Sequence, residues 1–326
     1  MIDKSDLKLI NMEQVEVEGV EWLMYPFIPY GKVTLIQGDP GEGKTTMVLQ
    51  IIAKLTKGEP ILPESAETLR DIIEPVNVIY QTAEDGLGDT IKPRLLAAGA
   101  DCSRVFVIDD NERALTMTDE RLDEAITRTN ARLVVLDPVQ GFLGADVDMH
   151  RANEIRPLMK RMAALAEKHK CAIIMIGHMN KNSGGKSCYR GLGSIDFQAS
   201  ARSVLVVGRV KDDPETRVVC HLKSSLAPEG TAIAFRLDKD TGFRWLGEYD
   251  ISIDELLCGD GKGLKLREAK EFLDDILSHG SVRQTEIAEE AEKRGIKSKT
   301  LWNAKKEMNI VSVKKGRQWY WMKDAE

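Results

Sequence analysis

An apolar segment, a glycine-rich loop and an amphipathic segment follow one another directly near the start of the chain. Residues 33–38 (VTLIQG) are apolar and β-branched, which is typical of a buried parallel strand. The loop GDPGEGKT comes next, and residues 45–58 then place apolar side chains at helical spacing before a glycine. This order predicts a strand that leads through a tight loop into a helix.

The same alternation continues along most of the chain. Further apolar segments of strand length lie at 76–82, 104–109, 132–137, 171–178 and 202–210, and the longest helical pattern lies at 152–170. Strands that alternate with helices predict an α/β fold with a parallel sheet covered on both faces. Residues 217–225, 231–238 and 242–249 predict antiparallel strands at one edge of that sheet.

The end of the chain has a different pattern. After the predicted α/β domain at 31–247, which follows a lead-in at 1–30, a segment with several glycines at 248–264 predicts a linker. Residues 265–326 contain three helical patterns, the third starting on a Ser298 cap, and then two short strands. Three helices and a hairpin predict a C-terminal winged helix-turn-helix domain.

Charge is distributed unevenly over the two predicted domains. The net charge is −6, yet residues 297–317 hold seven basic residues and one acidic residue. A local basic cluster on an acidic chain favours nucleic-acid binding at that end, and protein docking is the alternative. The predicted DNA contacts are Lys299, Asn303 and Lys306 on the recognition helix and Lys314, Lys315 and Arg317 on the wing. Leu301 and Trp302 are expected to pack in the core.

Other classes of protein are disfavoured. No segment approaches the roughly 20 consecutive apolar residues that a membrane helix needs, and the N-terminus lacks the pattern of a secretion signal. The five cysteines are scattered without a CxxC pair, which disfavours a disulfide framework or a zinc site. The expected localisation is cytoplasmic.

The glycine-rich loop fits the phosphate-binding pattern G-x-x-x-x-G-K-[ST] between a strand and a helix. Its backbone N–H groups can point at phosphate oxygens, the lysine ammonium can lie between the β- and γ-phosphates, and the threonine hydroxyl can bind Mg²⁺. The sequence therefore predicts ATP and Mg²⁺ as ligands. The predicted nucleotide contacts are Gly38, Asp39, Pro40, Gly41, Glu42, Gly43, Lys44, Thr45 and Thr46.

Three further polar residues follow predicted strands at the same edge of the sheet. Asp137 ends the segment LVVL and can hold the magnesium shell, or it can cap a turn. Glu84 follows VIYQTA and can polarise the attacking water, or it can be a solvated loop charge. His178 ends IIMIG and can sense the γ-phosphate, although a lone histidine often has only a packing role.

The segments GDPGEGKTT, YQTAED, LVVLDP, GHMNK and CHLKSSLAPEG, in this order, resemble the RecA/DnaB superfamily of P-loop ATPases. Within it they are most similar to the plasmid RepA-type hexameric helicases and the related AAA_25 ATPases of phages and mobile elements. The resemblance covers roughly residues 20–245. It implies a RecA-like ATPase domain with Lys44 and Thr45 as the Walker A pair, Asp137 as the Walker B aspartate and Glu84 as the catalytic glutamate. It also implies that His178 links nucleotide state to DNA contact.

The resemblance further implies a homo-oligomeric ring, expected to be a hexamer, in which a neighbouring subunit supplies basic side chains to the ATP. In DnaB-like proteins a K-x-R segment does this. Here it reads Lys223-Ser224-Ser225, so the lysine matches and the arginine does not. Arg202 and Arg209 are alternative sources of the arginine, and each can equally be an ordinary surface residue.

Single-stranded DNA is expected in the channel of such a ring. The glycine-rich segment 181–193 offers Lys181, Lys186 and Arg190 for phosphates, although a solvated active-site lid has the same composition. The leading hypothesis is that the protein is a ring-forming, DNA-stimulated ATPase of a mobile element that acts as a replicative helicase. The alternative is a DNA-bound regulatory or loader ATPase that acts as a switch without unwinding. A small-molecule kinase is disfavoured because no acceptor-substrate lid is recognisable.

Overall fold

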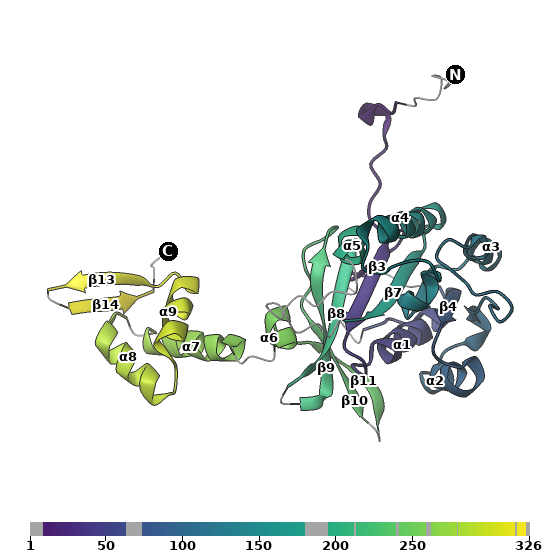
Figure 1. Ribbon diagram of the computed structural model, residues 1–326. Coiled ribbons are helices and arrows are strands. Elements are labelled where there is room, and N and C mark those ends of the chain that lie inside the picture. Colours follow the sequence, from purple (N-terminus) through teal and green to yellow (C-terminus); the bar gives the residue numbers. More distant parts are fainter. Residues whose placement is uncertain are drawn as a thin grey trace.

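The computed structural model describes residues 9–62, 74–179, 195–211, 213–238, 241–258, 262–278, 280–316 and 318–323. Within these residues, a nine-stranded sheet forms the framework of the larger lobe (Figure 1). The strands are β3 (Val33–Gly38), β4 (Val78–Thr82), β5 (Val105–Phe106), β6 (Leu133–Asp137), β7 (Ala172–His178), β8 (Ser203–Val210), β9 (Asp213–Ser224), β10 (Ile233–Asp238) and β11 (Gly242–Glu248).

The strand order is β11-β10-β9-β8-β3-β7-β6-β4-β5. From β8 to β5 every neighbouring pair is parallel, whereas the β8–β9, β9–β10 and β10–β11 pairs are antiparallel. The mixed α/β class and the mostly parallel sheet with an antiparallel edge are therefore confirmed. Because β3 lies between β7 and β8, the carboxyl ends of these three strands meet at one edge.

Alternation along each strand assigns successive side chains to opposite faces of the sheet. On β3, Ile36 belongs to a buried cluster with α1, whereas Leu35 belongs to a second cluster with α4. Helices α1 and α2 cover the first face and α3, α4 and α5 cover the second (Figure 1). The bounds are α1 (Lys44–Lys57), α2 (Lys92–Ala97), α3 (Glu120–Thr129), α4 (Ala152–His169) and α5 (Ile195–Ser200). None of the helices in the described part of the chain is long and apolar enough to span a bilayer.

Several short helical turns also occur, and the first of them belongs to the N-terminal lead-in and has no buried residue. They are η1 (Met12–Gln14), the π-helical η3 (Leu87–Ile91), η4 (Cys102–Arg104) and η5 (Val139–Phe142). Ile91 of η3 is buried in the same cluster as α1, while Val139 and Phe142 of η5 are buried against α3 and α4.

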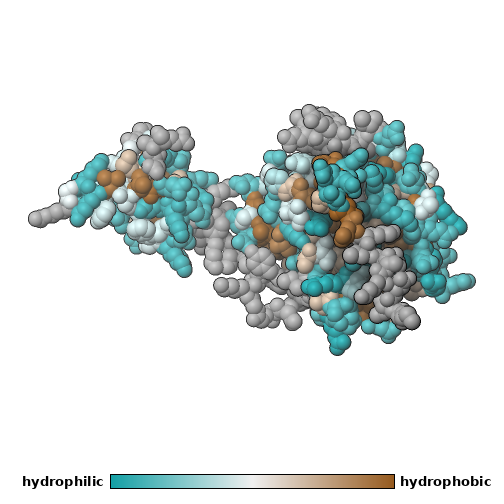
Figure 2. Space-filling model, turned by 90° about the horizontal axis from the view of Figure 1, so that it is seen from above, coloured by the Kyte–Doolittle hydropathy of each residue, from teal (hydrophilic) through white to brown (hydrophobic). Residues whose placement is uncertain are grey.

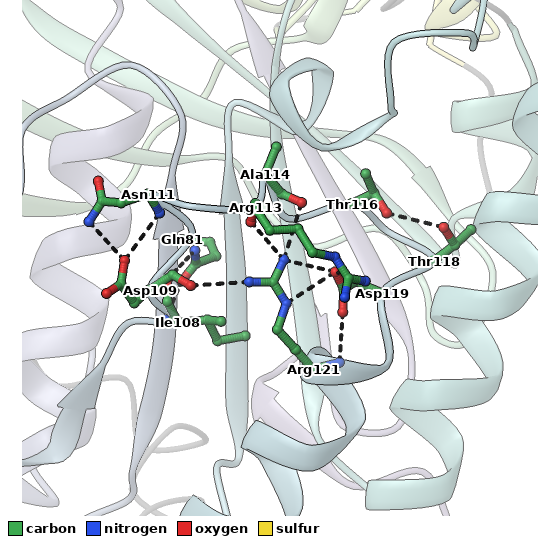
Figure 3. A network of polar contacts seen from close by, with 10 residues as sticks. All are labelled: Gln81, Ile108, Asp109, Asn111, Arg113, Ala114, Thr116, Thr118, Asp119 and Arg121. Carbon is green, nitrogen blue, oxygen red and sulfur yellow. Dashed lines mark hydrogen bonds and ion pairs between the residues drawn. The ribbon is translucent and has the colours of Figure 1, made fainter.

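The connection from β5 to α3 is held by polar contacts rather than by secondary structure (Figure 3). Gln81 on β4 exchanges two hydrogen bonds with the backbone of Ile108, at 3.0 and 2.8 Å. Arg121 donates to the backbone carbonyls of Asp109, Arg113 and Ala114 and forms an ion pair with Asp119, the buried N-cap residue of α3. Hydrogen bonds from the Arg121 side chain and backbone N–H to the Asp119 carboxylate keep the pKa of Asp119 below its usual value. The long loop is thereby fixed against the sheet edge.

Part of the segment expected to be a linker is helical. Helix α6 (Ile253–Cys258) packs against β8 and β9, and its Leu256 is buried with Val218 and Ala234. A Cβ atom at Gly208 would approach the Leu256 side chain to 2.9 Å. A helix therefore packs directly against the end of β8, within the segment that the glycines had led us to predict as a linker.

The C-terminal lobe has its own hydrophobic core, set apart from the larger lobe (Figures 1 and 2). Its elements are α7 (Lys262–Ile276), β12 (Val282–Arg283), α8 (Gln284–Lys293), α9 (Ser298–Glu307), β13 (Val311–Lys315) and β14 (Gln318–Met322). The strands form a three-stranded antiparallel sheet in the described residues, in the order β12-β14-β13. Ser298 is the first helical residue of α9, and Lys297 is its N-cap, without a side-chain hydrogen bond. The expected Ser298 cap was therefore wrong by one position.

The N-terminal hairpin of β1 (Trp22–Met24) and β2 (Ile28–Pro29) covers a buried histidine of β9. His221 stacks on Phe27 with ring centroids 4.6 Å apart, and its Nδ1 accepts a hydrogen bond from the Gly230 N–H at 3.1 Å. Burial lowers the pKa of His221 to about 4. The ring is therefore neutral in the folded protein near pH 7.

Acidification is expected to destabilise the fold through this ring. Below its unfolded pKa of about 6.5, His221 takes up a proton in the unfolded chain but not in the folded one. With a folded pKa of about 4, the free energy of unfolding should fall by roughly 3 kcal/mol between pH 6.5 and 4 from this group alone. Urea unfolding of the wild type and of His221→Gln at pH 7.5 and 5 measures how much the free energy of unfolding falls in each protein on acidification. Glutamine keeps an acceptor and lacks the titration, so equal pH dependence in the two proteins would contradict the assignment.

Candidate nucleotide-binding site

The loop between β3 and α1 depends on glycine at three positions. A Cβ atom at Gly38 would lie 2.2 Å from the carbonyl oxygen of Val207. Gly41 and Gly43 have φ angles of +82° and +84°, and a Cβ atom at Gly43 would lie 2.5 Å from Leu237 Cδ1. Other residues would be strained or would clash here. The loop therefore curls tightly over the start of α1, the geometry that directs backbone N–H groups inward.

The ammonium of Lys44 lies inside this loop. Its Nζ donates to the carbonyl oxygens of Gly38 and Asp39, both at 2.9 Å, and lies 3.4 Å from Nδ1 of His178. The side chain is buried, and burial lowers its pKa, while the carboxylate of Asp137 and others nearby oppose that shift. An anion bound in the loop would favour the charged ammonium further.

A carboxylate and two hydroxyls meet beside the loop. Oδ2 of Asp137 accepts hydrogen bonds from Thr45 Oγ1 at 2.7 Å and from the Tyr80 hydroxyl at 2.8 Å. Asp137 is buried, and burial raises its pKa, although these two donors and Lys44 oppose the shift. The phenol of Tyr80 thus fixes the orientation of the Asp137 carboxylate from within β4.

The donor set at this point suits Mg²⁺. Magnesium prefers hard oxygen ligands and is commonly held by one or two protein oxygens together with phosphate and water. Thr45 and Asp137 supply one hydroxyl and one carboxylate within hydrogen-bond distance of each other. Among the described residues no group of three or more His, Cys, Asp or Glu side chains forms a metal cluster. One hydroxyl and one carboxylate would leave the other coordination positions of Mg²⁺ to phosphate oxygens and water.

Glu84 and His178 lie on the solvent side of Lys44. Nε2 of His178 is 4.0 Å from Oε2 of Glu84, so the imidazole lies between the ammonium and the glutamate. The Glu84 side chain is 65% exposed, whereas the neighbouring Asp85 forms an ion pair with Arg94 at 3.0 Å. Of these two neighbouring carboxylates, Glu84 is therefore the more exposed and has no arginine partner at this edge among the described residues. Its role as base remains a prediction.

Arg209, at the end of β8, contacts the phosphate loop of its own subunit. Its Nη2 donates to the Gly41 carbonyl at 3.4 Å, and its Nε lies 3.5 Å from the Glu42 carboxylate. A pocket of about 160 Å³ lies beside this pair and is lined also by Leu256 of α6. The sequence offered Arg209 as a residue that reaches a neighbouring subunit or as an ordinary surface arginine, and in this structure it contacts the loop of its own subunit.

Two other basic residues considered for that neighbouring site have different surroundings. Lys223 Nζ donates to the carbonyls of Gln198, Ala199 and Ala201 at 2.7 to 3.0 Å, and so caps the end of α5. Arg202 is exposed at the start of β8. The contacts of Lys223 give it a stabilising role within the subunit, which the K-x-R comparison had not indicated.

The predicted DNA contacts fall into three groups. Lys181, Lys186, Arg190 and Arg317 lie outside the described residues. Lys299, Asn303 and Lys306 are exposed on α9, and Lys314 and Lys315 are exposed on β13. Neighbouring strand positions point to opposite faces, so Lys314 and Lys315 serve different faces of the hairpin. The structure thus brings together the phosphate-loop residues, and it places the described members of the predicted DNA contacts on α9 and β13 of the C-terminal lobe.

Sequence comparison agrees with this loop geometry. The AAA_25 family model, described as an AAA domain, matches residues 4–184, which include the phosphate loop, Glu84, Asp137 and His178. The chain belongs to the AAA_25 family. This AAA_25 chain is thus a member of the RecA-like P-loop ATPase superfamily.

The chain is also similar, at low sequence identity, to curated proteins named RecA and RadA. Protein RecA of Sinorhizobium medicae is 25% identical over 236 residues, which are 68% of this chain and 60% of that protein. DNA repair protein RadA of Listeria monocytogenes is 27% identical over 154 residues, which are 46% of this chain and 28% of that protein. The AAA_25 chain thus spans about 60% of the length of RecA.

Proposed function

We propose that this AAA_25 protein is a ring-forming ATPase that binds DNA and couples ATP hydrolysis to movement along it. The observation that carries the proposal is the line of Lys44, His178 and Glu84 beside the Thr45–Asp137 pair at one sheet edge. A buried ammonium, a hydroxyl–carboxylate pair and an exposed carboxylate therefore lie near one another, which supports roles for them in binding phosphate and metal and in activating water. That set serves phosphoryl transfer to water.

Each residue has a definite task in this proposal. The loop N–H groups and Lys44 hold the phosphates, and Glu84 accepts a proton from the attacking water. Thr45 and Asp137 would hold Mg²⁺, which would neutralise charge on the phosphate oxygens when bound. His178 touches both the phosphate-binding lysine and the side of Glu84, and so reports the state of the γ-phosphate.

The DNA and ring parts rest on similarity and on charge. The relatives described above are named as RecA and as a DNA repair protein, and the C-terminal lobe carries a concentrated basic segment. We assign that lobe, with three helices and a three-stranded sheet in its described residues, as a winged helix. In its more specific form, the proposal is that the protein forms a hexamer with single-stranded DNA in its channel, as RepA-type helicases do.

A switch without unwinding is the second candidate. The segment Lys223-Ser224-Ser225 lacks the arginine of the K-x-R pattern, and Lys223 is occupied by carbonyls of its own subunit. Without basic side chains from a neighbour, hydrolysis would be slow and would suit a regulator or loader on DNA. Arg209 would then complete the site from the same subunit.

Measurement of steady-state ATP turnover with and without single-stranded DNA tests the proposal that the protein moves along DNA. We expect several-fold stimulation, strand displacement on a tailed duplex, and a native mass that rises to that of a hexamer with ATP and DNA. Tight duplex binding without stimulation or strand displacement would support the switch instead. Absence of ATP turnover under every condition would overturn both.

A further inference from the structure

Two tryptophans of the C-terminal lobe are open to solvent. Trp302 on α9 is 48% exposed and Trp319 on β14 is 49% exposed, while Leu301 and Trp321 are buried. The prediction that Leu301 packs in the core agrees with its burial, and the same prediction for Trp302 was wrong. Large aromatic rings are usually buried, so two exposed indoles on one small lobe require a reason.

The two indoles lie on one continuous surface with two lysines. Trp319 and Trp321 share a face of β14, and Trp321 contacts Trp302 edge-on with centroids 5.2 Å apart. Lys305 Nζ lies 4.8 Å from the Trp302 ring centroid and 4.7 Å from that of Trp321. Lys314 is the register partner of Trp319 and lies 5.9 Å from its ring. Trp302, Lys305, Lys314 and Trp319 are called the tryptophan–lysine face below.

Further basic residues border this face. Lys299 and Lys306 are three residues before and four after Trp302, so all three lie on one side of α9, and both lysines are exposed. The single acidic residue of segment 297–317, Glu307, forms an ion pair with Lys270 of α7 at 2.7 Å. The surface around the two indoles therefore has a positive charge with no free carboxylate from that segment.

The opposite side of the hairpin is built differently. Lys315 lies over the ring of Tyr320 at 5.2 Å, and its Nζ donates to Ser281 Oγ at 2.8 Å. Tyr320 is only partly exposed, and its hydroxyl accepts a hydrogen bond from Arg283. On both sides a lysine donates to a serine hydroxyl of the lobe, since Lys305 Nζ likewise donates to Ser312 Oγ at 2.5 Å. The two sides differ in their aromatic rings, because the indoles of Trp302 and Trp319 are exposed whereas Tyr320 is only partly so. The Lys315 side provides a matched control surface with the same residue classes.

We propose that the tryptophan–lysine face binds a single-stranded DNA segment, with unpaired bases stacked on Trp302 and Trp319 and phosphates held by the lysines. The proposal rests on the DNA-binding part of the proposed function and is independent of ATP hydrolysis. Exposed aromatic rings stack on the faces of bases, and those faces are covered in a duplex. Lysines between the rings match the repeating phosphate charge. The combination therefore fits an unpaired strand better than groove reading of a duplex.

Comparison of two oligonucleotides of the same length tests the proposal on the full-length chain without ATP. One is oligo(dT), and the other is an abasic strand with the same phosphates and no bases. We expect the wild type to prefer oligo(dT), measured as the ratio of Kd values by fluorescence anisotropy. Trp302→Ala and Trp319→Ala should each reduce that preference about 5-fold or more, and should leave binding of the abasic strand unchanged.

Three controls separate stacking from charge and from misfolding. Trp302→Phe and Trp319→Phe keep a stacking ring and should retain most of the preference. Lys314→Ala should weaken binding of both strands equally, and Lys315→Ala, the same charge change on the opposite side, should weaken it less. An unchanged oligo(dT) preference in the Trp302→Ala/Trp319→Ala double variant, or stronger binding of duplex than of single strand, would overturn the proposal. Labelled ATP binding, measured separately, shows whether the nucleotide site itself fails.

Discussion

Glu84→Gln is expected to lower single-turnover ATP hydrolysis at least about 100-fold while ATP affinity stays nearly unchanged. Glutamine has the shape of the native side chain but cannot accept a proton from water. Glu84 is largely exposed, lies 4.0 Å from His178, and makes no hydrogen bond to the loop ammonium of Lys44, so its loss should spare binding. Rapid-quench hydrolysis and equilibrium binding of labelled ATP measure the two effects separately.

The adjacent carboxylate provides the control. Asp85 is paired with Arg94 at 3.0 Å, so Asp85→Asn should change turnover by a few-fold at most. If Asp85→Asn abolished hydrolysis and Glu84→Gln did not, the base would have to be reassigned. If both retained full activity, the attacking water would be activated from outside this pair.

Lys44→Ala is expected to weaken ATP binding at least about 100-fold, because it removes a buried cation that faces the phosphates. Two carbonyls that Lys44 now occupies would also lose their donor. Isothermal titration with ATP in magnesium buffer measures the loss.

A second lysine of the same helix gives the matched comparison. Lys54 is partly exposed on α1 and forms an ion pair with Glu59 at 2.7 Å, so Lys54→Ala should leave ATP binding unchanged. Wild-type affinity in Lys44→Ala would remove the basis for a nucleotide site in this loop.

Tyr80→Phe is expected to have a milder effect, because it removes only the hydroxyl that orients Asp137. The Mg²⁺ concentration needed for ATP turnover should rise about 10-fold in this variant.

Much of this site could be read from sequence because it depends on local order. A strand, a glycine loop and a lysine at fixed spacing leave little freedom in where Lys44 and Thr45 lie. Asp137 could be placed because a parallel strand that ends in a carboxylate delivers it to the same edge as β3. These inferences need only the period of a strand and the direction of a parallel sheet.

The parts that sequence missed depend on contacts between distant segments. Tyr80 stands in an apolar run and is recognised as a positioning group only when β4 lies beside β6, because the contact joins residues 57 positions apart. Lys223 had a motif and a role by analogy, yet its partners are carbonyls of α5. A polar residue in a buried strand was the available signal for Tyr80.

The seating of α6 on β8 has a mechanical consequence. Gly208 lies beneath Leu256, and the next residue, Arg209, contacts the loop at Gly41 and Glu42. Two consecutive residues at the end of β8 therefore contact, respectively, the helix that precedes the C-terminal lobe and the loop proposed to bind phosphate. A bulkier residue at position 208 would push against Leu256 and displace α6 from β8. It would thereby disturb the attachment of the C-terminal lobe without contacting a bound nucleotide.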